Sequence, residues 1–312
     1  YAYRLPKEYD PSRAYPLILA IPGIGEVPAD HIRAHWELRE IQERVILLCP
    51  AMPEHQEDWD GVMVKGRPGG LSHVLTGLRI AAERFAVDFD RVYVAGYDKG
   101  VPAAVAAGNY SPQRFAAIIG QAGAAGPMRP DNFSNLPTFF AGAAGEARAF
   151  GAAAKEAGYD NSVFQADGTE QDIWTWMQRN PRRAQPERVL LVPGDPFPTR
   201  AYWLQVNPSA PDARATATIE RATNTIRIAA HGIAQATLFL NDELVDLSRP
   251  VRVVCNDVEQ SSDVPRQLTS FLDMLYDGIS DPGALYVARA EYDLTGGASS
   301  VYGADAVAGV VN

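Results

Sequence analysis

Short apolar runs, many of them β-branched, alternate with segments of helical periodicity from the N-terminus to about Arg183. Runs that are apolar at every position are typical of strands covered on both faces, and an apolar stripe with a period of 3.6 residues predicts an amphipathic helix. Strands that alternate with helices form right-handed βαβ units. The pattern predicts an α/β domain over residues 1–183 with a doubly wound, mostly parallel sheet. The expected strands are 17–21, 45–49, 91–95, 115–120, 138–141 and 162–165, and the expected helices are 71–85, 101–109, 146–157 and 173–179.

From residue 188 onward, strand-like runs follow one another without intervening helices, at 201–206, 215–220, 225–229, 236–240, 244–247 and 251–255. Asn241-Asp242 supplies residues that tolerate left-handed backbone, which predicts a hairpin turn there. We expect a smaller β-rich annex over 188–276, an antiparallel sheet or sandwich that ends in a helix at 265–275. Residues 277–312, rich in Gly, Ala and Ser near their end, are expected to form a weakly structured C-terminal tail.

Composition limits the classes of partner. The 28 basic and 38 acidic side chains give a formal net charge of −10, and no run of Lys or Arg occurs, which argues against a nucleic-acid partner or an anionic membrane surface. No apolar stretch approaches the ~18 residues of a membrane span. The two cysteines, Cys49 and Cys255, lie far apart in apolar runs and are expected to be buried free thiols.

The pentapeptide Gly96-Tyr97-Asp98-Lys99-Gly100 stands between a predicted strand and an alanine-rich predicted helix. Small residues two positions before and after a central residue, at a sharp strand-to-helix turn, are typical of the nucleophile elbow of α/β hydrolases. The central residue needs a positive φ, which Asp tolerates better than most residues. We therefore place Asp98 at the nucleophile position, and Gly96 and Gly100 at the small positions of the elbow.

Three segments extend this resemblance: YAYRLPKEYDPSRAYPLILAIPGIGE, AAERFAVDFDRVYVAGYDKG and SPQRFAAIIGQAG. Over residues 1–183 the chain resembles secreted or extracytoplasmic esterases of the polyhydroxybutyrate-depolymerase and prolyl-oligopeptidase-like groups, and the annex resembles β-rich extensions of some bacterial members. The resemblance implies an α/β-hydrolase fold, carboxylesterase ancestry, an extracytoplasmic location, and no cofactor or metal. It also implies an oxyanion hole of backbone amides, one from the Gly23-Ile24-Gly25 loop and one from Lys99.

The catalytic side chains of that family are not matched. Its members carry serine at the place of Asp98, an acid after the strand at 138–141, and a histidine in a late loop. The corresponding loop, 166–171, contains no histidine, and Glu170 stands nearest to the expected place. Glu146 stands nearest to the expected acid. Because serine attack needs both the hydroxyl and a base, a serine-type triad is excluded at these positions.

Three hypotheses remain open. The first is a pseudoenzyme, in which the cleft above Asp98 binds a small ester-like ligand or the chain serves in assembly with a protein partner. The second is an active hydrolase with Asp98 as nucleophile, as in haloalkane dehalogenases and epoxide hydrolases, or with Asp98 and Glu170 as a like-charge acid/base pair. The third makes the annex a carbohydrate- or protein-binding module. We favour the first.

Two further groups are weaker candidates. His31 and His35 lie four residues apart with Glu37 close behind, a spacing that would place both imidazoles on one helix face for zinc. The pattern is not H-E-x-x-H, so we interpret them as surface histidines. The acidic loop at 54–60 follows a predicted strand, where ligands bind in open α/β sheets, and it could bind a cation or a basic partner. We interpret it as a solvated charge run.

Overall fold

The computed structural model describes residues 1–302 with the exception of 125, 127–129, 143–144, 195–198, 278–280 and 295–300. The chain divides into two compact units, Tyr1–Arg183 and Ala184–Asn312. Within the described part of the chain, no helix has the length and apolar character that crossing a membrane requires.

The first unit is built on a seven-stranded sheet of order β1-β3-β2-β6-β7-β8-β9. Every neighbouring pair is parallel except the edge pair of β1 and β3, so the predicted α/β class with a mostly parallel sheet is confirmed. The strands are β1 (Ala2–Arg4), β2 (Tyr15–Ile21), β3 (Ile46–Cys49), β6 (Val87–Tyr97), β7 (Ala117–Gln121), β8 (Thr138–Ala141) and β9 (Ser162–Gln165).

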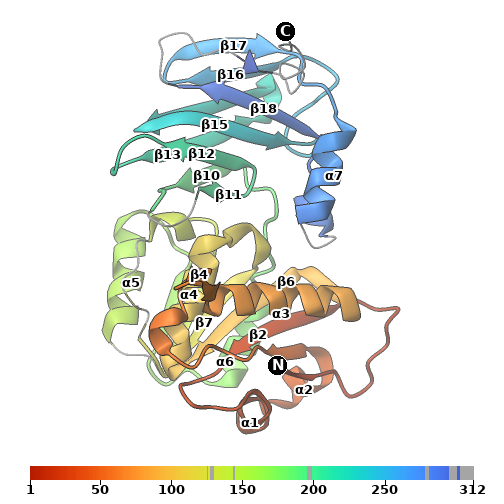
Figure 1. The fold of residues 1–312 in the computed structure, drawn as a ribbon, viewed down its shortest axis with the longest axis vertical. Coiled ribbons are helices and arrows are strands. Elements are labelled where there is room, and N and C mark those ends of the chain that lie inside the picture. Colours follow the sequence, from red (N-terminus) through yellow and green to blue (C-terminus); the bar gives the residue numbers. More distant parts are fainter. Residues whose placement is uncertain are drawn as a thin grey trace. The chain divides into compact units, whose positions relative to one another are not determined.

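Helices cover both faces of this sheet, as a doubly wound fold requires (Figure 1). One face packs on α1 (Pro28–Ala34), α2 (Arg39–Arg44) and α6 (Glu170–Met177), whose apolar residues share a core with Ile18 and Tyr93. The other face packs on α3 (Gly70–Arg84), α4 (Val101–Tyr110) and α5 (Gly145–Glu156), where Gly77 of α3 approaches Leu19 and Gly108 of α4 lies against Ile118. A short hairpin, β4 (Met63–Val64) and β5 (Arg67–Pro68), precedes α3.

The order of strands reverses beside β2. The chain passes from β2 to β3 on one side and then returns to β6 on the other side of β2 before continuing outward to β9. In open α/β sheets, the crevice at the carboxyl ends of the strands at such a switch point is where ligands bind. The loops after β2 and β6, which contain Gly23 and Asp98, therefore meet at the position where this fold places a site.

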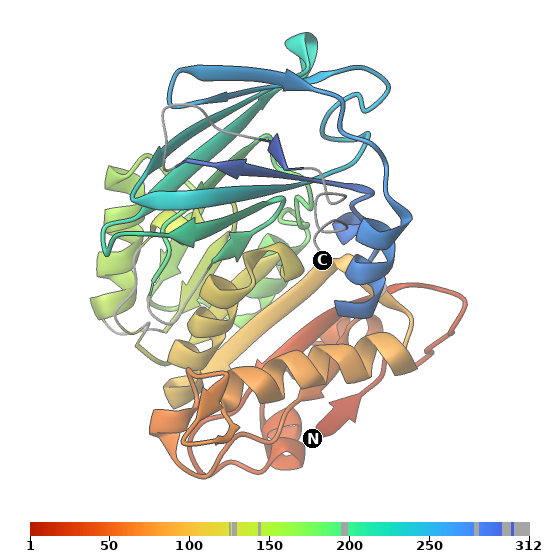
Figure 2. The same cartoon turned by 45° about the horizontal axis from the view of Figure 1, so that its top comes forward.

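The second unit contains two five-stranded sheets, seen in green to blue in Figure 2. Their inward residues, among them Trp203, Ile226 and Leu238, form one core, so the unit is a β-sandwich. One sheet has the order β10 (Arg188–Leu191), β13 (Arg214–Glu220), β14 (Thr225–His231), β16 (Val251–Cys255), β17 (Val258–Ser262). The other has the order β11 (Arg200–Ala201), β12 (Leu204–Pro208), β15 (Ile233–Leu240), β18 (Ala288–Asp293), β19 (Val301–Tyr302), and α7 spans Leu268–Asp277.

Two expectations for this unit are wrong. Residues 244–247, expected to be the strand after a hairpin turn at Asn241-Asp242, form a turn segment in which the Asn241 carbonyl and side chain accept the Leu244 N–H. β15 pairs instead with β12 and β18, and β16 pairs in parallel with β14. The expected tail at 277–312 contains β18, which pairs with β15 inside a sheet and buries Tyr292.

Candidate functional site

The turn after β6 has a backbone that only small residues at its flanks permit. Asp98 has the expected positive φ, +47°, and begins a short 3-10 turn, Asp98–Gly100, that leads into α4. A Cβ at Gly96 would clash with the Gly100 carbonyl, and a Cβ at Gly100 would lie 2.6 Å from the Pro22 carbonyl oxygen. The turn is therefore closed tightly against the end of β2.

Asp98 and Glu26 flank Gly23 at this switch point. A Cβ built on Gly23 would lie 3.8 Å from the Cβ of Asp98 and 3.5 Å from the carboxyl carbon of Glu26. The Asp98 side chain is half-buried, and the Lys99 side chain is exposed. Two carboxylates thus stand at the position where the predicted esterase resemblance expects a nucleophile and an oxyanion hole.

Glu26 connects this turn to His31 of α1 and to His35, the residue that follows α1. Glu26 Oε2 lies 2.7 Å from His31 Nδ1, and Glu26 Oε1 lies 3.5 Å from His35 Nε2. The His35 ring packs on the ring of Tyr97, with centroids 4.0 Å apart, and the two imidazole centroids are 4.7 Å apart. One donor atom from each of the three residues lies within 4.8 Å of the others, so the group could hold a metal ion.

The interpretation of His31 and His35 as surface histidines is wrong. The side chain of His31 is 1% exposed and that of His35 is 21% exposed, because both rings pack toward Tyr97 at the end of β6. Their acidic partner is also not Glu37, which is exposed, but Glu26, which sequence patterning missed. The available signal was the position of Glu26 shortly before Pro28, where the helix that carries His31 begins.

Burial and hydrogen bonding lower the pKa values of both Glu26 and His31, which favours a Glu26 carboxylate beside a neutral His31 ring. Desolvation lowers the pKa of His31, and the Glu26 carboxylate offsets only part of that effect. For Glu26, partial burial acts to raise the pKa, but hydrogen bonds from the Gly23 N–H and from His31 outweigh it and leave the pKa below its ordinary value. At neutral pH the pair is therefore a carboxylate hydrogen-bonded to an uncharged imidazole.

The first predicted oxyanion amide has an internal partner. The Gly23 N–H donates to Glu26 Oε2 at 2.9 Å, so a carboxylate of the chain itself occupies this donor. Ile24, the neighbouring residue in the predicted hole, has a half-exposed side chain. The expectation that Gly23 offers a free amide is therefore corrected, since the donor is engaged within the loop that carries it.

Glu170 has a structural position that the prediction of a base did not anticipate. It is the first residue of α6, and its carboxylate accepts the backbone N–H groups of Trp36 at 2.5 Å and of Leu38 at 2.7 Å. Trp36 is buried with a positive φ of 65°, and its carbonyl accepts a hydrogen bond from Arg4 at 2.6 Å. Glu170 therefore fixes the loop that follows His35. For Glu146, the predicted acid, the side chain lies outside the described residues.

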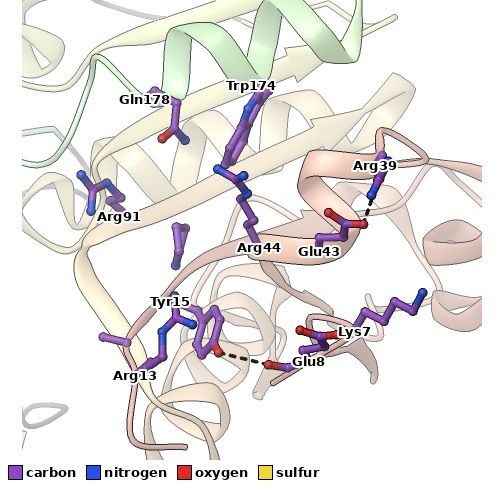
Figure 3. A pocket seen from close by; sticks show the side chains of 12 residues that line it. Lys7, Glu8, Arg13, Tyr15, Arg39, Glu43, Arg44, Arg91, Trp174 and Gln178 are labelled. Atoms are coloured by element: carbon purple, nitrogen blue, oxygen red, sulfur yellow. Dashed lines mark hydrogen bonds and ion pairs between the residues drawn. The ribbon is translucent and has the colours of Figure 1, made fainter. Parts of the chain in front are cut away.

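Two cavities of the first unit bear on the site. One of about 320 Å³ adjoins the β6 turn, and its lining combines the acidic loop at 54–60 with the turn and α4: Gln56, Glu57, Trp59, Asp60, Lys99, Pro102 and Ala103. A larger one of about 730 Å³ lies at the amino end of the sheet, beside Tyr15 and Arg91, and is rich in arginine (Figure 3). Ligands of open α/β sheets bind at the carboxyl ends of the strands, so the smaller cavity is the candidate cleft.

No family model matches the chain, and its sequence matches no curated protein. Among solved structures, the chain is similar to a thermostable esterase, with 18% identity and a TM-score of 0.47, and the match covers 58% of each chain. It is also similar to a ferulic acid esterase from Anaeromyces mucronatus, with 10% identity and a TM-score of 0.43 over 57% of this chain and 83% of that one. Esterase PE8 matches at 14% identity and a TM-score of 0.39, over 57% and 95% of the two chains. The chain spans less than two thirds of the length of the thermostable esterase.

Proposed function

We propose that this protein is a pseudoenzyme of carboxylesterase ancestry, whose cleft at the ends of β2 and β6 binds a ligand and does not hydrolyse esters by the serine route. The observation that carries this proposal is the hydrogen bond from the Gly23 N–H to Glu26. An oxyanion hole stabilises developing negative charge with free, preorganised donors. A carboxylate that already occupies one donor both removes it and repels an anionic intermediate.

The positions of the other expected catalytic residues support the same conclusion. Asp98 replaces the hydroxyl nucleophile and is accommodated by the positive φ of the turn. Glu170, at the place expected for the histidine, uses its carboxylate to bind the backbone of Trp36 and Leu38. Because each carboxylate oxygen of Glu170 accepts one of these N–H groups, both oxygens face the loop after His35.

One observation favours hydrolysis by Asp98 as a second candidate. His35 packs on Tyr97, the residue that precedes Asp98, and it is partly exposed. An aspartate nucleophile needs a histidine to activate the water that releases the ester intermediate. In this second function, His35 would supply the base that the late loop lacks.

A panel of short-chain p-nitrophenyl esters separates the two functions. The pseudoenzyme proposal predicts no turnover by the wild-type chain and no gain in Asp98→Ser, because the serine would still lack a base and a free Gly23 amide. Turnover that is lost in Asp98→Asn and in His35→Ala, but kept in the control Asp167→Asn, would overturn the proposal and establish the second function. Asp167 is an exposed carboxylate of the same unit. Near-UV circular dichroism of each variant verifies that the fold is retained.

A further inference from the structure

The group formed by Glu26, His31 and His35 has the donor set of a transition-metal site. Its two imidazoles and one carboxylate are also the protein ligands of several catalytic zinc sites. Ligands of one tetrahedral zinc ion lie roughly 3.3 Å apart, because each is about 2.0–2.1 Å from the metal. Here the carboxylate oxygens lie 2.7 Å from His31 Nδ1 and 3.5 Å from His35 Nε2, and the three donor atoms of the group are within 4.8 Å of one another. Small side-chain rotations would enclose an ion.

The donors are held in place by their surroundings. His31 lies in α1 and His35 caps its C-terminus, where the His35 N–H donates to the His31 carbonyl and the two ring centroids are 4.7 Å apart. Tyr97 packs against the His35 ring, and the Gly23 N–H holds one oxygen of Glu26. Hydrogen bonds and packing of this kind around ligands orient them and raise metal affinity. The backbone immediately after His35 is itself fixed by Glu170.

We propose that Glu26, His31 and His35 bind one divalent transition-metal ion, for which zinc is the natural probe. Imidazole and carboxylate donors suit zinc and its first-row neighbours, in contrast to the oxygen-only sets of calcium and magnesium. The ion takes the place of the proton that His31 and Glu26 share at 2.7 Å. Three protein ligands leave at least one position for water or for an oxygen atom of a ligand, beside Asp98. The site does not depend on the proposed function, since a metal ion fits a binding cleft and a hydrolytic one equally.

The test is a titration of the full chain, freed of metal by dialysis against EDTA, with Zn²⁺ in a calorimeter and with Co²⁺ by visible absorption. We expect one equivalent to bind, with the intense d–d bands of four- or five-coordinate cobalt. Glu26→Gln and His35→Ala should each weaken binding by at least 100-fold, since loss of even an outer-shell partner costs 10- to 100-fold. His231→Ala is the matched control, because His231 makes a similar contact, 2.9 Å to Asp212, on the exposed surface.

The proposal is overturned if no equivalent binds, if His35→Ala binds as tightly as the wild type, or if His231→Ala abolishes binding. Glu26→Gln also replaces the charged acceptor of the Gly23 N–H by a weaker amide oxygen and can loosen the loop, so the decisive variant is His35→Ala, whose side chain is partly exposed. Near-UV circular dichroism confirms that each titrated variant is folded. If the group serves only as an internal hydrogen-bond network, all four proteins titrate without a saturable site.

Discussion

Replacement of Glu170 by alanine should destabilise the first unit strongly. The change removes two hydrogen bonds from backbone N–H groups to a charged acceptor, at Trp36 and Leu38, and each is worth about 1.5–3 kcal/mol. It also removes a negative charge from the first turn of α6, worth roughly 0.3–1 kcal/mol. Because Glu170 is half-buried, water recovers part of this loss. We expect the free energy of unfolding to fall by about 3 kcal/mol.

In a unit of this size, that loss lowers the melting temperature by roughly 6–12 °C. Differential scanning calorimetry measures the shift, and near-UV circular dichroism reports the environment of Trp36. The melting temperature of Glu170→Gln should lie between those of the wild type and Glu170→Ala, because the amide oxygen accepts one backbone N–H while the NH₂ group faces the other. Asp167→Asn, an exposed carboxylate shortly before α6, is the control and should melt like the wild type.

The same experiment tests the hypothesis that Glu170 acts as a base paired with Asp98. If Glu170 faced Asp98 as a like-charge pair, its removal would relieve repulsion, and the alanine variant would be at least as stable as the wild type. A melting temperature for Glu170→Ala equal to or above that of Asp167→Asn would refute the structural role argued from the two backbone contacts.

Two further predictions follow from burial and close packing. Gly100→Ala places a methyl group 2.6 Å from the Pro22 carbonyl oxygen, so its urea midpoint should drop by an amount equivalent to more than about 2 kcal/mol. The control Ala103→Gly, in α4, should lower the free energy of unfolding by only about 1 kcal/mol. Equal midpoints for the two variants would contradict a tightly closed turn. Burial raises the pKa of Cys49 to about 12 and that of Cys255 to about 11. Both stay protonated until the pH approaches those values, so Ellman's reagent at about pH 8 should label neither in the native protein and both in guanidinium. Rapid labelling of the native chain would show that the thiols are accessible.

The centre of the sheet of the first unit follows from local sequence, because β2, β3, β7 and β8 are short, almost fully buried apolar runs. The run at 17–21, for example, lies within β2, and the one at 138–141 is β8. Local sequence predicts less of the second unit, because its strand pairings are set by contacts between residues far apart in the chain. No local pattern indicates that β16 pairs with β14. β18 does carry a strand signal that the prediction of a tail missed, because apolar and polar residues alternate over Ala288–Asp293.

The candidate site likewise combines features that local sequence predicts with features that depend on distant contacts. The positive φ at Asp98 and the need for Gly100 are properties of one turn, and the pentapeptide predicts both. The contact of Glu170 with Trp36 joins residues that are 134 positions apart, so no spacing rule could reveal it. Glu26 is closer in sequence to the histidines, but its role depends on how the loop after β2 folds back onto Gly23.

The conformation of the loop after β2 shows how the same backbone amide could hold either a substrate oxygen or a side-chain carboxylate. The loop after β2 points an amide at the switch point of the sheet, where an esterase would use it to hold the negative charge of an intermediate. In this chain the same amide holds the negative charge of Glu26 and aims that carboxylate at His31 and His35. Asp98 needs only the positive φ of its turn to be accommodated there. If the proposed function and the proposed metal site are both correct, the amide of this loop orients a metal ligand in place of a substrate.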